Sequence, residues 1–202
     1  AELIGKLRAP HVTDWSEKIA TPDRLLYRRN NFAGPVDELI CTALRTELDA
    51  EIALSPGFRW GLTTLAGQPL TMEDVLAETA ITYPETYVAT MTGGQIKDVL
   101  EDVCDNLFNV DPYYQQGGDM VRAGGLFYAC NPTNAIGSRI SELKLDNGKA
   151  INAVKRYKVA GWASVNGQQG APMWDVLAKY LRSGRMFQER LGSGVTLKGV
   201  DG

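Results

Sequence analysis

Histidine is almost absent from this sequence, since His11 is its only occurrence among 202 residues. A Ser-His-Asp triad or a metal site with several histidine ligands would therefore have to be built around that residue. His11 lies between Pro10 and Val12 in a stretch that we expect to be extended, which favours a surface or linker position. Motifs such as D-x-H, GNH and H-x-H are also missing, so we assign the chain no two-metal centre, no metal ligand and no catalytic residue.

Long apolar segments and basic clusters are missing as well. No apolar run approaches the roughly 20 residues that a membrane-spanning helix needs. The net charge is -3, and no stretch rich in Lys and Arg stands out. We therefore expect neither a membrane nor a nucleic-acid partner. Ala1 does not open a signal-peptide pattern, and we expect a mature or excised segment of a longer protein.

Cysteine is scarce and is confined to Cys41, Cys104 and Cys130. These three residues are far apart, their number is odd, and they form no CxxC pair of the kind that binds metal. Cys41 and Cys104 fall on the apolar faces of expected helices, so we interpret both as buried thiols.

The rest of the composition is typical of a globular protein. Hydrophobic residues make up 44% and charged residues 22%, and the length allows one large domain or two small ones. We expect residues 1–34 to be an extended linker that joins a further domain, and residues 35–182 to form a substrate-binding domain. Residues 183–202 contain few core residues, so we expect a tail that wraps the surface or links onward.

Helical patterns occur at four places. Pro35, followed by two acids that favour a helix N-terminus, precedes apolar residues at helical spacing. Thr71 and Asp74 form a capping box before a short helix. Thr92 opens a second long helix, and a last helix starts near Pro172.

Strand patterns alternate with these helices and then dominate the second half. They predict strands at residues 51–55, 86–91, 119–130, 138–146, 150–156 and 157–163. The sequence DNG at 146–148 is typical of a tight hairpin turn. This order of elements predicts an α+β domain with a mixed or antiparallel sheet and packed helices.

The most unusual stretch is QQGGDMVRAGG, residues 115–125. Glycine weakens a strand interior and often marks a bulge or a close approach by a ligand or another backbone. The stretch is therefore either a sharp turn into a strand or a place where something sits against the main chain. Asp119 and Arg122 would point to opposite faces of a regular strand and would form no ion pair, unless a glycine bulge intervenes.

The stretch ALSPGFRWG, residues 53–61, places Arg59 and Trp60 at the tip of a buried strand. The planar guanidinium of Arg59 suits the oxygens of a phosphate, carboxylate or sulfonate. The simpler alternative is a surface arginine that pairs with a carboxylate.

The stretch YKVAGWASVNGQQGAPMW, residues 157–174, ends a strand at Trp162 beside a polar loop and a helix start. An aromatic residue in that position is a common ligand platform. Alternatively, Trp162 belongs to the core and the loop is only a connection.

The order of these pieces resembles the C-terminal domain of the 5′-nucleotidase family. ALSPGFRWG is similar to the anion-binding loop of that family, with Gly57 and Arg59 matching. MTGGQIKDVLE, residues 91–101, resembles the helix start of the family, and Trp162 in YKVAGW falls at the position of its second base-stacking aromatic. Two departures stand out. GQQGAP lacks the Asp and Tyr of the family loop, and QGG at 116–118 replaces the first base-stacking aromatic, so a base sandwich would lack one side.

GGDMVR, together with SPGFRWG, resembles the SoxB group within this family, the thiosulfohydrolases of periplasmic sulfur oxidation. The resemblance runs from about Leu3 to Arg182. It implies metal-assisted hydrolysis by a longer periplasmic enzyme, with two manganese ions in an N-terminal metallophosphatase-like domain outside this chain. The implied substrate is a cysteine S-thiosulfonate on the carrier protein SoxYZ, from which sulfate is released. This chain alone is expected to be inactive.

The resemblance also implies a set of substrate-binding residues. They are Arg59, Trp60, Gly117, Gly118, Asp119, Arg122 and Trp162. Arg59 and Arg122 would face the anionic group, while Gly117 and Gly118 would leave space for an extended carrier peptide. Two alternatives stay open, namely a nucleotidase domain that binds mononucleotides and a carrier-binding module without a catalytic partner.

Overall fold

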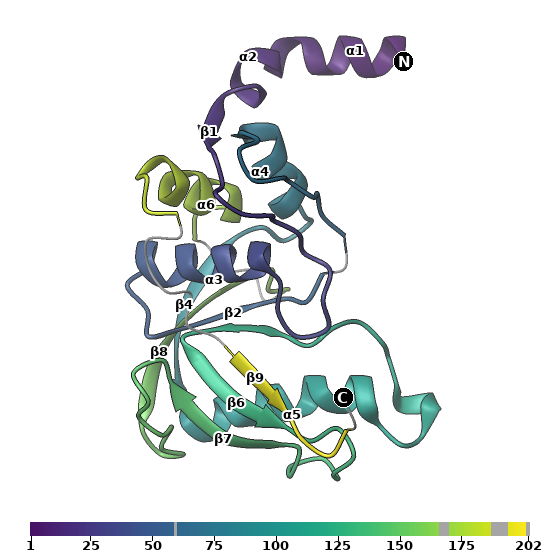
Figure 1. Cartoon of the computed structure of the whole chain (residues 1–202), viewed down its shortest axis with the longest axis vertical. Helices are drawn as coiled ribbons and strands as arrows, with labels where there is room; N and C mark the ends of the chain where they lie inside the picture. Colours follow the sequence, from purple (N-terminus) through teal and green to yellow (C-terminus); the bar gives the residue numbers. More distant parts are fainter. Residues whose placement is uncertain (59, 166–169, 187–193, 201–202) are drawn as a thin grey trace.

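Helices and small β-sheets make up the fold (Figure 1). The computed structural model describes residues 1–58, 60–165, 170–186 and 194–200. Helices and strands mix along the sequence, and parallel and antiparallel strand pairs both occur. The predicted α+β class with a mixed sheet is therefore confirmed.

The central sheet has four strands, which positions the site described below. Its order is β4 (Thr86–Thr92), β8 (Arg156–Trp162), β2 (Ile52–Ser55), β5 (Arg122–Gly124). β2 and β8 are parallel, and the two outer strands run antiparallel to their neighbours. All four residues of β2 are buried, as is usual for a strand whose two faces are both covered.

The first hydrophobic core lies between the central sheet and three helices, which Figure 1 shows stacked above it. These helices are α3 (Pro35–Glu47), α4 (Met72–Thr79) and α6 (Met173–Arg182). α3 begins with a proline and carries Asp37 and Glu38 in its first turn. α4 has the predicted capping box, in which Thr71 and Asp74 each bond the other's backbone N–H. Three of the four predicted helix starts are thus confirmed here.

The second core lies on the other face, beneath α5 (Gly93–Phe108), whose N-cap is Thr92 as predicted. A three-stranded sheet closes this core. Its order is β7 (Ile140–Leu145), β6 (Leu126–Cys130), β9 (Gly194–Leu197). The predicted single strand at 119–130 is wrong, because Gly125 has a φ of 76° and divides it into β5 and β6, which join different sheets.

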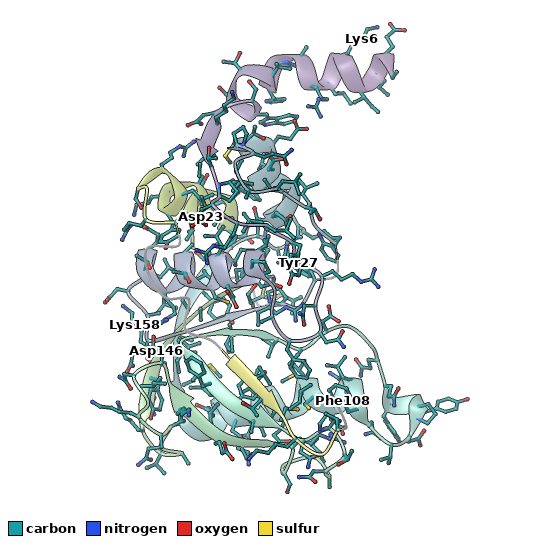
Figure 2. All side chains as sticks on the ribbon, in the orientation of Figure 1. Lys6, Asp23, Tyr27, Phe108, Asp146 and Lys158 are labelled. Carbon is teal, nitrogen blue, oxygen red and sulfur yellow. The ribbon has the colours of Figure 1, made fainter. Side chains whose placement is uncertain are left out.

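The N-terminal segment differs from the extended linker that the sequence suggested. It contains α1 (Glu2–Arg8), η1 (Ala9–His11), α2 (Val12–Trp15) and β1 (Lys18–Ala20). β1 pairs with β3 (Leu70–Thr71). Figure 2 shows α1, which carries Lys6, projecting away from the body of the domain. Leu26 and Arg28, later in the segment, have buried side chains. The first part of the segment is helical, and pairs at i,i+4 spacing such as Glu2–Lys6 favour that conformation. The last third of the segment contributes to the core.

Two further expectations need correction. Residues 183–202 do more than wrap the surface, because Gly194–Leu197 form β9, parallel to β6. The predicted strand at 150–156 does not form, because β8 begins only at Arg156. The carbonyls of Ala153 and Lys155 instead accept hydrogen bonds from the first N–H groups of α5. The irregular connection thus supplies hydrogen-bond acceptors for N–H groups in the first turn of α5, which have no partner within the helix. The sequence pattern does not reveal this role.

Candidate functional site

The candidate site is a groove of about 390 Å³ on the α5 side of the central sheet, at the edge where β2 and β8 end. Since β2 and β8 are parallel, Ser55 and Trp162 reach the same edge. Val99 and Val103 of α5 form one wall, and Met91 of β4 continues the apolar surface. A largely apolar groove with a few polar groups is the usual composition of a ligand site.

Trp162 is the predicted site residue that ends β8, and it serves the core and the groove together. Its side chain is 3% exposed, yet it lines the groove. Its Nε1 donates a hydrogen bond to Ser55 Oγ at 2.7 Å, and Phe58 meets it edge-on at 5.7 Å between centroids. The indole is thereby fixed, and only part of it is accessible to a ligand.

Tyr87 is a groove residue that sequence reasoning missed. It lies opposite Gly161 in the pairing of β4 with β8. A Cβ on Gly161 would lie 2.4 Å from both Cζ and Oη of Tyr87, so the ring rests against the glycine backbone. Burial raises the pKa of the Tyr87 hydroxyl, which therefore stays protonated and able to donate. The available signal was a glycine within an apolar strand, which often marks such a close approach.

Asp119 also lines the groove, and it is held in place by a buried arginine. Arg122 is 1% exposed, and its Nη2 lies 3.3 Å from Asp119 Oδ2. The Nε of Arg122 lies 2.9 Å from Asp37 Oδ2, and Nη2 also donates to the carbonyl of Asn30 at 2.5 Å. Arg122 thus sits behind Asp119 and does not line the groove.

The structure therefore corrects the expected relationship between Asp119 and Arg122. β5 begins only at Arg122, so the alternation of a regular strand does not extend back to Asp119. Gly117 and Gly118, with φ of 78° and 95°, turn the chain before it reaches the strand. The two side chains pair because of this turn, which was the exception that the sequence left open.

The buried ion pairs continue to a second arginine. Asp37 bridges Arg122 and Arg28, whose Nε lies 3.0 Å from Asp37 Oδ1. Arg28 also contacts Glu78, whose Oε1 accepts a hydrogen bond from the N–H of Leu62. Burial raises the pKa of both Asp37 and Glu78, while the neighbouring arginines oppose that rise. This network supports the loop that carries Asp119.

The tip of β2 carries an aromatic cluster beside the groove. Phe58 stacks on Trp60 at 4.2 Å between centroids, and the guanidinium of Arg28 lies 5.1 Å from the Phe58 ring. Trp60, one of the predicted site residues, remains 52% exposed. Arg59, the predicted anion ligand, lies outside the described residues, as do residues 166–169 of the predicted polar loop. Trp60, which follows Arg59 in the sequence, therefore offers the accessible aromatic surface of this cluster.

The glycine-rich stretch lies against the tip of β2 and also contains glycines in open surroundings. A Cβ on Gly57 would lie 2.5 Å from the carbonyl oxygen of Met120, so the tip of β2 and the stretch touch there. At Gly117 and Gly118, in contrast, an added Cβ would meet no described atom within 4 Å. Tyr113, shortly before them, is 96% exposed. Close backbone approaches therefore occur at Gly57 and at Gly125, where an added Cβ would lie 2.5 Å from the carbonyl oxygen of Glu51. Gly117 and Gly118 instead have room for a Cβ among the described atoms.

Two family-like positions outside the groove have structural roles. Thr92 caps α5, and the buried carboxylate of Glu101 accepts hydrogen bonds from the N–H groups of Gly137, Arg139 and Ile140. Glu101 therefore fixes the connection from β6 to β7 on α5. Neither residue reaches the groove lining.

Metal ligands are not gathered anywhere in the described part of the chain. Across residues 1–58, 60–165, 170–186 and 194–200, no three or more His, Cys, Asp or Glu side chains form a group that could hold a metal ion. We therefore derive no metal-dependent step from the residues of the groove.

Comparisons with known proteins agree with this arrangement. The family model for the 5′-nucleotidase C-terminal domain matches residues 18–176. The structure of the sulfate thiohydrolase SoxB from Thermus thermophilus, in complex with glycerol, has a TM-score of 0.87 and 33% sequence identity to this chain. That similarity covers 99% of this chain and 38% of the SoxB chain.

More distant structures share the fold. A putative 5′-nucleotidase from Staphylococcus aureus has a TM-score of 0.75 and 16% identity, covering 98% of this chain and 44% of its own. The NAD nucleotidase NadN from Haemophilus influenzae has a TM-score of 0.71 and 16% identity, covering 98% of this chain and 41% of its own. No curated protein sequence matches the chain. The chain thus spans less than half the length of these solved relatives.

Proposed function

We propose that this chain, which belongs to the 5′-nucleotidase C-terminal domain family, is the substrate-binding domain of a SoxB-type sulfohydrolase. The longer enzyme would release sulfate from a cysteine S-thiosulfonate on the carrier protein SoxYZ, in periplasmic thiosulfate oxidation. The observation that supports this most strongly is the similarity to SoxB at 33% identity over nearly the whole chain. Identity to the nucleotidases is half of that, at 16%.

The groove suits a carrier-borne substrate in this proposal. An extended peptide would lie over Gly117 and Gly118, where the described chain leaves open space. Its apolar portion would pack on Val99, Val103 and the accessible part of Trp162. An extended chain fits better here than a planar base, because the indole of Trp162 is largely covered.

The anionic group of the substrate is assigned to Arg59, with Trp60 beside it. Arg122, predicted for the same task, forms buried ion pairs with Asp37 and Asp119 and does not line the groove. We therefore propose that Arg122 acts by positioning Asp119. A carboxylate at Asp119 would repel a sulfonate, so it would direct the anion towards Arg59 and accept hydrogen bonds from peptide N–H groups.

Catalysis is proposed to need a further domain of a longer protein, which would hold two manganese ions. When bound, such metals activate water and polarise the substrate. The described residues of this chain contain no group that could hold them. In the same described part, no helix is long and apolar enough to span a membrane.

Calorimetry with a short carrier-like peptide that bears a cysteine S-thiosulfonate tests the proposal, with AMP as a second ligand. We expect the peptide to bind, AMP to give no signal, and Arg59→Ala to abolish peptide binding. Arg182→Ala is the matched control, because Arg182 pairs with Glu17 and does not line the groove. AMP binding with a silent peptide would overturn the proposal in favour of a nucleotidase domain.

A non-catalytic carrier-binding module is the alternative from another class. It would bind the same peptide, so affinity does not distinguish it. Sulfate release by the longer protein does, because a module without a catalytic partner would release none at any manganese concentration.

A further inference from the structure

Two of the three cysteines, far apart in the sequence, meet inside the second core. Cys104 lies on α5 and Cys130 ends β6. Their Sγ atoms are 3.4 Å apart, and both side chains are 0% exposed. Cys41 is also buried, but its Sγ contacts the carbonyl oxygen of Arg122 at 3.9 Å instead. The fold therefore selects one pair from the three thiols.

We propose that Cys104 and Cys130 are a cross-linking site that closes to a disulfide and ties α5 to β6. A disulfide has its sulfur atoms about 2.05 Å apart, so the two Sγ atoms need to approach by only about 1.4 Å. Small rotations about the two Cα–Cβ bonds can supply that movement. The two elements already pack against each other in one core, so the bond would not require a new arrangement.

The chemistry balances with a disulfide as oxidant. The thiolate of one cysteine attacks the oxidant disulfide, a mixed disulfide forms, and one thiolate of the oxidant leaves. The thiolate of the second cysteine then attacks the protein-bound sulfur of the mixed disulfide, and the second thiolate of the oxidant leaves. Two protein thiols lose two electrons and two protons, and the oxidant disulfide becomes two thiols.

Burial decides when this exchange occurs. Exchange requires a thiolate and access to an oxidant, and a solvent-excluded core disfavours both. The bond therefore forms while the chain folds, before α5 closes over β6, or during opening of that core. Once formed, it is shielded from reductants by the same packing.

The cross-link also concerns the groove. Val103, which precedes Cys104 on α5, lines the groove together with Val99. A bond from Cys104 to Cys130 would hold this wall on the second sheet and limit motion of α5. This inference is independent of the substrate, because it rests on the sulfur geometry alone.

The test is to refold the reduced 202-residue chain in a mixture of oxidised and reduced glutathione and to alkylate the remaining thiols in denaturant. Intact mass should show one alkylated thiol, and peptide mapping should link residues 104 and 130. The Cys41→Ala variant should show none. Three alkylated thiols, or a link that includes Cys41, would overturn the proposal.

A second measurement needs no variant. Thermal unfolding of the wild-type chain, refolded with and without the oxidant, should show a Tm higher by roughly 5–15 °C for the oxidised form. A bond that formed but left Tm unchanged or lowered it would contradict a native geometry that accommodates the bond. Cys104→Ser and Cys130→Ser should each abolish the difference between the two conditions.

Discussion

The ring of Tyr87 on β4 rests against the backbone of Gly161 on β8, so that no side chain fits between them. This contact places a phenol in the groove beside Trp162. It also explains why a glycine occupies a buried strand, where glycine is otherwise unfavourable.

Gly161→Ala should lower the free energy of unfolding by about 1–3 kcal/mol, because the new Cβ would collide with the ring of Tyr87. Urea denaturation measures the change. In the Tyr87→Ala background the same substitution should cost much less, since the obstacle is gone. Equal costs in both backgrounds would contradict the contact.

Ser55→Ala should destabilise the chain by about 1–3 kcal/mol, because Trp162 Nε1 would become a buried donor without an acceptor. Denaturation followed by tryptophan fluorescence is the measurement. Ser16→Ala is the control, because the hydroxyl of Ser16 donates to the carbonyl of Thr13 in an exposed turn. A Ser55→Ala variant as stable as this control would show that the hydrogen bond contributes little to the free energy of unfolding.

Asp37→Asn should be strongly destabilising, by about 3–5 kcal/mol, because Arg28 and Arg122 would both lose a buried anionic partner. Asp23→Asn is the matched control, since Asp23 pairs with Arg24 at the exposed surface and should be nearly silent. Similar unfolding free energies for the two variants would argue against the network.

The pH dependence of stability should report on Glu78. Its folded pKa is raised above the ordinary value of 4.5 by burial, so the folded state binds the proton more tightly than the unfolded chain. The contribution of Glu78 to the free energy of unfolding is therefore lost as the pH rises above about 4.5. The unfolding free energy of the wild type minus that of Glu78→Gln should fall from pH 4 to pH 7. A rise would mean that Arg28 outweighs burial.

Gly117→Ala and Gly118→Ala should weaken binding of the carrier-like peptide more than they weaken folding. Each residue has a positive φ, so alanine carries a backbone cost of about 1–2 kcal/mol even in open space. Gly148→Ala is the matched control, with a φ of 82°, open surroundings and a place in the 146–148 turn. If all three variants bind the peptide like wild type, the glycines do not serve the carrier.

Local signals in the sequence were sufficient to predict most helices and central strands. The signals at Pro35, at the Thr71 capping box, at Thr92 and in the buried run at 51–55 act within a few residues. The elements begin within one residue of the positions that these signals indicate. The family resemblance likewise rests on short motifs. Such features are legible because capping and periodicity depend on neighbours along the chain.

Tertiary structure alone decided which distant residues meet. The pairing of Asp119 with Arg122 depends on a glycine turn, the contact of Tyr87 with Gly161 depends on strand register, and the sulfur pair depends on packing of α5 against β6. β9 joins its sheet only through a parallel pairing with a strand more than 60 residues earlier. The sequence by itself therefore determined most of the helices, several of the strands and the family. The groove and its polar contacts were decided by long-range packing, because no local pattern encodes which strand ends share an edge.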